Sequence, residues 1–181
     1  GSSASTPQHG FEVGGLRQGT GPLSNGDADV ALIIQDFLTH PRFGAGFNLN
    51  LIELDTLMSS PAATTTGDGS LQTYCRALGI GLSPALSSQE PAGSTLDRWA
   101  QLTDSMVCWT GYSLRFIARG TEEITANGYH YVPALSVAYV INDDHLVAEA
   151  GEPPISVNRT DPADSNNILK LNVKNRDNEY N

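Results

Sequence analysis

The chain has 181 residues, the length of one domain or of one domain with part of a second. Apolar residues make up 39% of it, a little below the usual level, and 18 glycines and 10 prolines predict many turns. A formal net charge of -10 without basic clusters argues against nucleic acid or anionic lipid as a partner. Apolar runs are too short for a membrane span, and no secretory leader is expected.

The N-terminal part predicts a flexible lead-in followed by a strand and a helix. Residues 1–10 are polar and small, and Gly1-Ser2 suggests an expression scar, so we expect the natural protein to begin elsewhere. A short strand is expected at Phe11–Val13. A helix is expected over about Asp27–Leu38, with Asn25 or Asp27 as its N-cap and Pro41 ending it. Its apolar stripe consists of Val30, Ile33, Ile34, Phe37 and Leu38.

Two further helices are expected in the middle of the chain. Residues 49–58 are compatible with either a strand or a helix. A helix over about Ser70–Leu78 would end at Gly79, and a short strand over residues 80–82 follows it. The next helix is expected to start at Ser94, with Asp97 at capping-box spacing. Its expected buried face consists of Leu96, Trp99, Leu102, Thr103 and Met106.

The second half of the chain predicts antiparallel strands. Residues 107–110 and 113–118 are expected to form a hairpin around Gly111-Tyr112. A second pair is expected between residues 129–132 and 135–141, entered through Asn127-Gly128. The last strand alternates over residues 169–174, and because the chain stops soon after it, we expect a fragment of a larger protein. Helices followed by antiparallel strands predict an α+β fold with three short helices.

Residues that could support chemistry are scattered, and none is predicted to be catalytic, cofactor-binding or metal-binding. The strongest metal candidate is Asp143-Asp144-His145, but neighbouring residues seldom point at one ion. The loop with Asp161 and Asp164 lacks the spacing of a calcium loop. The other candidates, each assigned a structural role, are His9, His40, His130, Glu122-Glu123, Glu149, Glu152, Gly14-Gly15, Gly44–Gly46 and Asn158–Thr160. We therefore expect a protein that is not an enzyme and has no cofactor.

The cysteines and aromatic residues are predicted to be structural. Cys75 and Cys108 lie far apart in apolar surroundings, which favours two free, buried thiols over a disulfide or a CxxC site. Four aromatic residues fit core positions better than a stacking platform: Trp99, Trp109, Tyr112 and Phe116.

Two segments, residues 28–46 and residues 157–160 with 166–181, resemble tail-tip or baseplate-hub proteins of long-tailed bacteriophages, prophages and gene transfer agents. Residues 28–46 are similar to a helix followed by D-x-L-T-[NH]-P-R-[YF]-G-x-G. Residues 157–160 and 166–181 resemble the family's N-x-[VI] … [DN]-R-[DE]-N-x-Y strand. Between them, residues 74–80 and 96–114 follow the family's order, including a turn of the W-x-G-Y-x-L type.

The resemblance implies a trimeric hub that joins the tail tube to the central spike or fibre. It implies an α+β domain at 26–147, inserted between strands of an incomplete tube-like β-barrel at 11–25 and 148–181. Expected partners are further copies of the chain and other tail proteins, including the tube or distal tail and the spike or fibre. The expected location is the virion tail tip, with the bacterial cytoplasm during assembly. The family carries no catalytic residues in this region to transfer.

Two other functions remain open. A receptor- or carbohydrate-binding module would present Trp109 or Tyr112 in a groove. A cell-wall hydrolase would need two carboxylates across a cleft, or a metal at Asp143–His145.

Overall fold

The computed structural model describes residues 27–86, 88–135, 139–142, 146 and 170. The chain divides into two units, Gly1–Ser136 and Val137–Asn181, and all the described helices and strands belong to the first. The strand expected at Phe11–Val13 lies outside the described residues, as does the strand at 169–174 apart from Lys170. The division into an inserted domain and a barrel stays a prediction.

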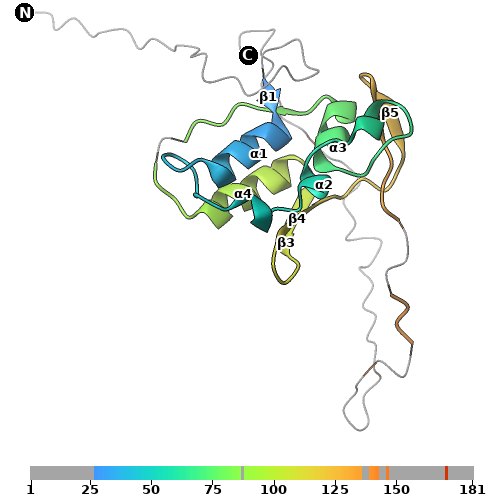
Figure 1. Cartoon of the computed structure of the whole chain (residues 1–181). Coiled ribbons are helices and arrows are strands. Elements are labelled where there is room, and N and C mark those ends of the chain that lie inside the picture. The colour runs from blue at the N-terminus through green and yellow to red at the C-terminus, as the bar shows by residue number, and fades with distance from the viewer. Residues whose placement is uncertain (1–26, 87, 136–138, 143–145, 147–169, 171–181) are drawn as a thin grey trace, which may run out of the picture. The chain divides into compact units, whose positions relative to one another are not determined.

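Helices and small antiparallel sheets are mixed in the first unit (Figure 1). Three two-stranded sheets pair β1 with β2, β3 with β4 and β5 with β6, and no closed barrel occurs among the described residues. In chain order the elements are β1 (Ala28–Asp29), α1 (Val30–Thr39), η1 (Leu49–Leu51), α2 (Leu54–Leu57), η2 (Pro61–Thr64), α3 (Leu71–Leu78), β2 (Gly81–Leu82), α4 (Ala92–Leu102), β3 (Ser105–Trp109), β4 (Leu114–Ala118), β5 (Ile124–Ala126) and β6 (Tyr129–Tyr131).

Helix α1 confirms the expected helix, but its N-cap is neither Asn25 nor Asp27. Asp29 caps it, because the Asp29 carboxylate accepts hydrogen bonds from the first free backbone amides of the helix. Asp27 instead accepts a hydrogen bond from the Ser83 hydroxyl at 2.6 Å. The helix ends at His40, which is extended ahead of Pro41 as expected. The apolar stripe is buried or half-buried: Val30, Ile33, Ile34, Phe37 and Leu38.

Helix α3 follows the sequence signals at both ends. The Ser70 hydroxyl accepts a hydrogen bond from the Thr73 amide at 3.2 Å, and Gly79 ends the helix in the left-handed conformation with φ of 72°. Leu71, Tyr74 and Cys75 are buried on one face of the helix, whereas Leu78 at its end is 44% exposed. The ambiguous stretch 49–58 forms two short helices, η1 and α2, and no strand.

Helix α4 starts earlier than expected and is capped differently. It begins at Ala92, so Ser94 and Asp97 lie inside it and the capping-box prediction was wrong. Glu90, before the helix, accepts a hydrogen bond from the Thr95 hydroxyl at 2.7 Å. Trp99 is buried and contacts the Phe37 ring edge-on at 5.0 Å between centroids. Leu102 and Met106 were expected in the core, but both are exposed. Leu102 is the last residue of α4, and Met106 lies in β3, beyond the helical spacing on which the prediction depended.

One hairpin prediction is confirmed, and the other had the wrong partner. Strands β3 and β4 pair over their whole length. Strand β6 pairs with β5, not with residues 135–141, because Asn127 and Gly128 turn the chain with φ of 53° and 79°. Positive φ at both central residues is the geometry of a type I′ hairpin turn. The described residues of 135–141 form no strand.

The core lies where α1, α3, α4 and the β3–β4 hairpin meet. Tyr74 of α3 and Tyr131 of β6 close it with ring centroids 4.9 Å apart, and the Tyr131 hydroxyl donates to the Gly120 carbonyl at 3.0 Å. Gly120 is required there, because a Cβ would lie 2.6 Å from the Tyr74 ring. In Figure 1 the β3–β4 hairpin extends beyond the helices at its turn.

Candidate functional site

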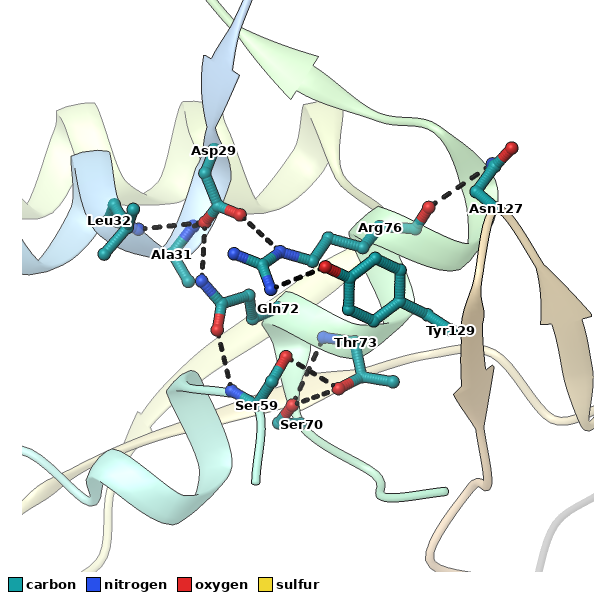
Figure 2. A network of polar contacts seen from close by, with 10 residues as sticks. All are labelled: Asp29, Ala31, Leu32, Ser59, Ser70, Gln72, Thr73, Arg76, Asn127 and Tyr129. Atoms are coloured by element: carbon teal, nitrogen blue, oxygen red, sulfur yellow. Dashed lines mark hydrogen bonds and ion pairs between the residues drawn. The ribbon is translucent and has the colours of Figure 1, made fainter. Parts of the chain in front are cut away.

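A buried carboxylate, Asp29, organises the polar interior. It is 3% exposed and accepts hydrogen bonds from the amides of Ala31 and Leu32 at 3.1 and 3.2 Å. It also accepts from Gln72 Nε2 at 2.9 Å and from Arg76 Nε at 2.7 Å (Figure 2). One carboxylate therefore caps α1 and holds α3 against it.

Arg76 extends these contacts to the β5–β6 hairpin (Figure 2). Its Nη1 donates to the Tyr129 hydroxyl at 3.1 Å, and its guanidinium carbon lies 5.0 Å from the centre of that ring. The Asn127 side chain donates to the Ala77 carbonyl at 3.0 Å, near the end of α3. We call the set Asp29, Gln72, Arg76, Asn127 and Tyr129 the Asp29 network.

A second polar cluster fixes the loop before α3. Gln72 Oε1 accepts from the Ser59 amide at 2.8 Å, and Asp68 accepts from the Ser60 amide at 2.6 Å. Burial opposes the charge of Asp68, but hydrogen bonds from Thr73, Ser60 and Ser70 outweigh it and lower the pKa of this carboxyl. In the described part of the chain every buried side-chain nitrogen and oxygen has a hydrogen-bond partner, as is expected of polar groups that stabilise a fold.

The end of the β3–β4 hairpin is built around a second carboxylate, Glu53. Gly111 adopts φ of 93° in the bend between the strands, a conformation that favours glycine, and the Thr110 amide donates to the Ser113 carbonyl at 3.0 Å. Glu53 Oε1 accepts from the hydroxyls of Thr110 and Ser113 at 2.5 and 2.7 Å, which lowers the pKa of Glu53. Arg115 Nε lies 3.6 Å from Glu53 Oε2.

Two aromatic side chains project from this end of the hairpin. Trp109 is 57% exposed and Tyr112 is 89% exposed, so their expected burial was wrong, whereas Trp99 and Phe116 are in the core as predicted. Trp109 is the last residue of β3 and Tyr112 lies in the turn, beyond the elements that cover the sheet. The half-buried Phe47 ring contacts Trp109 at 6.0 Å between centroids. We call Phe47, Glu53 and Trp109–Ser113 the hairpin end.

The described candidates from the sequence have local roles. His40 Nδ1 accepts from the amides of Arg42 and Phe43 at 3.2 and 3.4 Å, and its ring stacks on Phe43. His130 Nε2 contacts the exposed Glu123 carboxylate. Gly44 packs against the end of α1, since a Cβ there would lie 2.8 Å from the His40 carbonyl oxygen.

Both cysteines are free, as predicted. Cys75 is buried, and burial together with the nearby Asp29 charge raises its pKa to about 12. Such a thiol is a poor nucleophile at neutral pH. Cys108 is only half-buried, which corrects the expectation that both thiols lie in the interior.

Several predicted candidates lie outside the described residues, and their assignment stays a prediction. They are His9, Gly14-Gly15, Asp143-Asp144-His145, Glu149, Glu152, Asn158–Thr160, Asp161 and Asp164.

A surface pocket of about 390 Å³ lies between α4 and the loop after β2. Glu90 and Arg98 meet there at 2.5 Å, beside the buried Trp99. The two opposite charges satisfy each other, which leaves the pocket without an uncompensated charge to attract an ionic ligand.

Sequence reasoning missed the residues that organise both sites. Asp29 and Arg76 are 47 residues apart, and Glu53 and Ser113 are 60 apart, so no local motif joins them. The one usable signal was an Asp directly before an apolar helical stripe, which is typical of an N-cap.

Among the described residues, no three His, Cys, Asp or Glu side chains are grouped as a metal ion would require. None of the described helices is long and apolar enough to cross a membrane.

Comparison with known proteins identifies one family. No curated protein and no solved structure gives a significant match. A family model, Phage-tail_3, described as "Putative phage tail protein", matches residues 91–181, which is half of the chain. The matched range contains α4, both hairpins β3–β4 and β5–β6, and therefore the exposed aromatic residues of the hairpin end. The chain belongs to this phage tail protein family.

Proposed function

We propose that the chain is a structural piece of the phage tail tip or baseplate hub, within a larger protein that joins the tail tube to a central spike or fibre. The family match supports a tail role, and the resemblance of residues 28–46, 157–160 and 166–181 to hub proteins supports the position at the tip.

The observation that carries the proposal is the structure of the Asp36–Gly46 segment, which bears the most specific part of the resemblance. The Ala45 amide donates to the Phe37 carbonyl at 2.8 Å, and the Phe47 amide donates to the Leu38 carbonyl at 2.7 Å. Gly44 has no room for a side chain, and Gly46 has φ of 66°. The motif thus serves a tight backbone turn that returns the chain along α1, as expected of a structural element.

In this proposal the chain assembles with other tail proteins, is part of a homotrimer in the full-length protein, and catalyses no reaction. Its place is the tail tip of the virion, after assembly in the bacterial cytoplasm.

Cryo-electron microscopy of tails assembled with the full-length protein tests the position and the symmetry. We expect three copies around the channel at the end of the tube that faces the host. Density along the tube wall or at the end nearest the capsid would contradict the tip assignment while leaving the tail family intact.

A digestion assay tests the expectation that the chain is not an enzyme. Purified bacterial cell walls, incubated with the chain, are expected to keep their turbidity and release no sugar. Clearing that disappears in a double variant with Glu122→Gln and Glu123→Gln would instead favour a hydrolase.

A further inference from the structure

The turn of the β5–β6 hairpin consists of an Asn-Gly pair, Asn127-Gly128. In such a pair the backbone nitrogen of the glycine can attack the side-chain carbonyl carbon of the asparagine, because the glycine has no side chain to hinder the approach. Both residues are exposed, and a Cβ at Gly128 would meet no atom within 4 Å, so solvent has access to the turn. The turn therefore contains the two residues and the access to water that loss of the Asn127 amide requires.

The reaction is deamidation, and its atoms balance with water as the co-reactant. The Gly128 nitrogen bonds to Cγ of Asn127, and the bond from Cγ to Nδ2 breaks. Nδ2 leaves as ammonia, with the proton that the Gly128 amide gives up. Water then opens the resulting cyclic succinimide at one of its two carbonyls. The product is an aspartate, or an isoaspartate in which the main chain passes through the former side chain.

The folded turn opposes closure of the succinimide ring. The ring requires the Asn127 Cβ and the Gly128 nitrogen on the same side of the Asn127 Cα–C bond. The two residues have φ of 53° and 79°, as in a type I′ turn, whose first central residue has ψ of roughly +30°. In an L-residue this ψ places Cβ and the next nitrogen on nearly opposite sides of that bond. The backbone of the turn must therefore change conformation before the reaction.

Contacts with α3 hold the turn in its unreactive conformation (Figure 2). Asn127 Nδ2, the leaving group, donates to the carbonyls of Arg76 and Ala77 at 3.3 and 3.0 Å. The Tyr129 hydroxyl, directly beyond the turn, accepts from Arg76 Nη1 at 3.1 Å. Arg76 is fixed in turn by the buried Asp29 at 2.7 Å. The turn is thus joined to the end of α3 on both sides of Gly128.

We propose that Asn127 is a deamidation site that reacts when the β5–β6 turn detaches from α3, and that the reaction weakens this attachment. The new carboxylate lacks the hydrogens that Nδ2 donates. It also places a negative charge beside the carbonyls at the C-terminal end of α3, where the helix dipole is negative. Each modified molecule therefore opens more often than before. The proposal concerns the attachment of this hairpin and does not depend on the position of the chain in the tail.

Peptide mapping by mass spectrometry tests whether the fold controls the reaction. The intact chain is incubated in mildly alkaline buffer with and without urea, and conversion of Asn127 is followed over days. The folded chain is expected to react at least about tenfold more slowly than the unfolded chain, because only the opened fraction of molecules reacts. A second Asn-Gly pair, Asn25-Gly26, provides a reference for the rate in urea. Equal rates at Asn127 in both conditions would overturn the proposal.

Two matched variants test whether the contact with α3 controls the rate. Tyr129→Phe removes the hydroxyl that accepts from Arg76, so the rate at Asn127 should rise about threefold in the folded chain and stay unchanged in urea. Tyr112→Phe removes an exposed hydroxyl from the other hairpin and should change neither rate. Folded-chain rates that are the same in the two variants would contradict control by α3.

Asn127→Asp tests the consequence of the reaction. Aspartate has nearly the size of asparagine and also adopts positive φ, so the variant changes mainly the hydrogen-bond donor and the charge. The midpoint temperature of thermal unfolding is expected to fall, and the amides of β5 and β6 are expected to exchange hydrogen faster than in the natural chain. If neither the midpoint nor the exchange changes, deamidation does not weaken the attachment and the proposal fails.

Discussion

The Asp29 network and the hairpin end are both organised by a carboxylate with several hydrogen-bond donors, but the first is buried and the second lies at the surface. In each, one carboxylate gathers donors from segments far apart in the chain. Asp29 is 3% exposed and its partners join α1, α3 and the β5–β6 hairpin, whereas Glu53 lies at the surface and holds one turn. Because a buried charge that loses a partner cannot be rescued by water, the first site supports stability. We expect that the second can be altered without unfolding the chain, because water can replace a partner that is lost at the surface.

The largest expected effect comes from removing the Asp29 carboxylate. Asp29→Ala leaves Arg76 and Gln72 without their acceptor and removes the cap of α1. We expect a loss of about 3 kcal/mol in the free energy of unfolding, at the lower end for a broken buried pair, because the Arg76 side chain is 20% exposed. Urea denaturation followed by circular dichroism measures it.

Asp29→Asn serves as the matched control. It keeps an acceptor for the α1 amides and for Gln72 but removes the charge that faces Arg76, so a smaller loss of about 1–2 kcal/mol is expected. If both variants lower the free energy of unfolding by less than about 1 kcal/mol, the Asp29 network does not hold the fold together as we describe.

The next effect concerns the packing beside the network. Gly120→Ala places a Cβ 2.6 Å from the Tyr74 ring, so overpacking should cost about 1–3 kcal/mol. Gly93→Ala, in the first turn of α4, meets nothing within 4 Å and should stabilise the chain by up to about 1 kcal/mol. The midpoint temperature of thermal unfolding should therefore fall for Gly120→Ala and rise for Gly93→Ala. A midpoint that moves in the same direction in both variants would show that the Tyr74–Tyr131 contact is loosely packed.

Asp68, in the loop before α3, makes the free energy of unfolding depend on pH. Its folded-state pKa lies below the unfolded value, so its contribution is present above the unfolded pKa and is lost as pH falls through the folded pKa. Unfolding by urea at several pH values between 7 and 3 should show stability falling toward acid. Asp68→Asn should flatten that dependence relative to the natural chain. An unchanged slope in the variant would assign the acid sensitivity to other carboxyls.

The smallest effect on stability is expected at the hairpin end. Tyr112→Ser removes an 89% exposed side chain from a turn whose geometry depends on Gly111 and Glu53, so the free energy of unfolding should change by at most about 0.5 kcal/mol. The same urea titration as for Asp29→Ala measures it. A loss above about 1 kcal/mol would mean that Tyr112 is part of the fold, and the contrast between the two regions would fail.

Local sequence patterns predicted the elements that local physics controls. Apolar spacing found the helices α1, α3 and α4, Ser70 and Gly79 marked both ends of α3, and Gly111 marked the β3–β4 turn. Asn127-Gly128 was identified as a turn, but it was read as the entry to a hairpin instead of its centre, so the partner of β6 was wrong.

Patterns along the chain were sufficient to predict a mixture of helices and antiparallel strands, the positions of the longer helices, and the resemblance to phage tail proteins, because propensity, caps and motifs depend on residues close together in the chain. The folded arrangement alone shows that Asp29 holds Arg76, that Glu53 supports the hairpin turn, and that Trp109 and Tyr112 are exposed. These outcomes depend on which distant segments pack side by side, and an apolar residue in a strand has the same local pattern whether or not another element covers it.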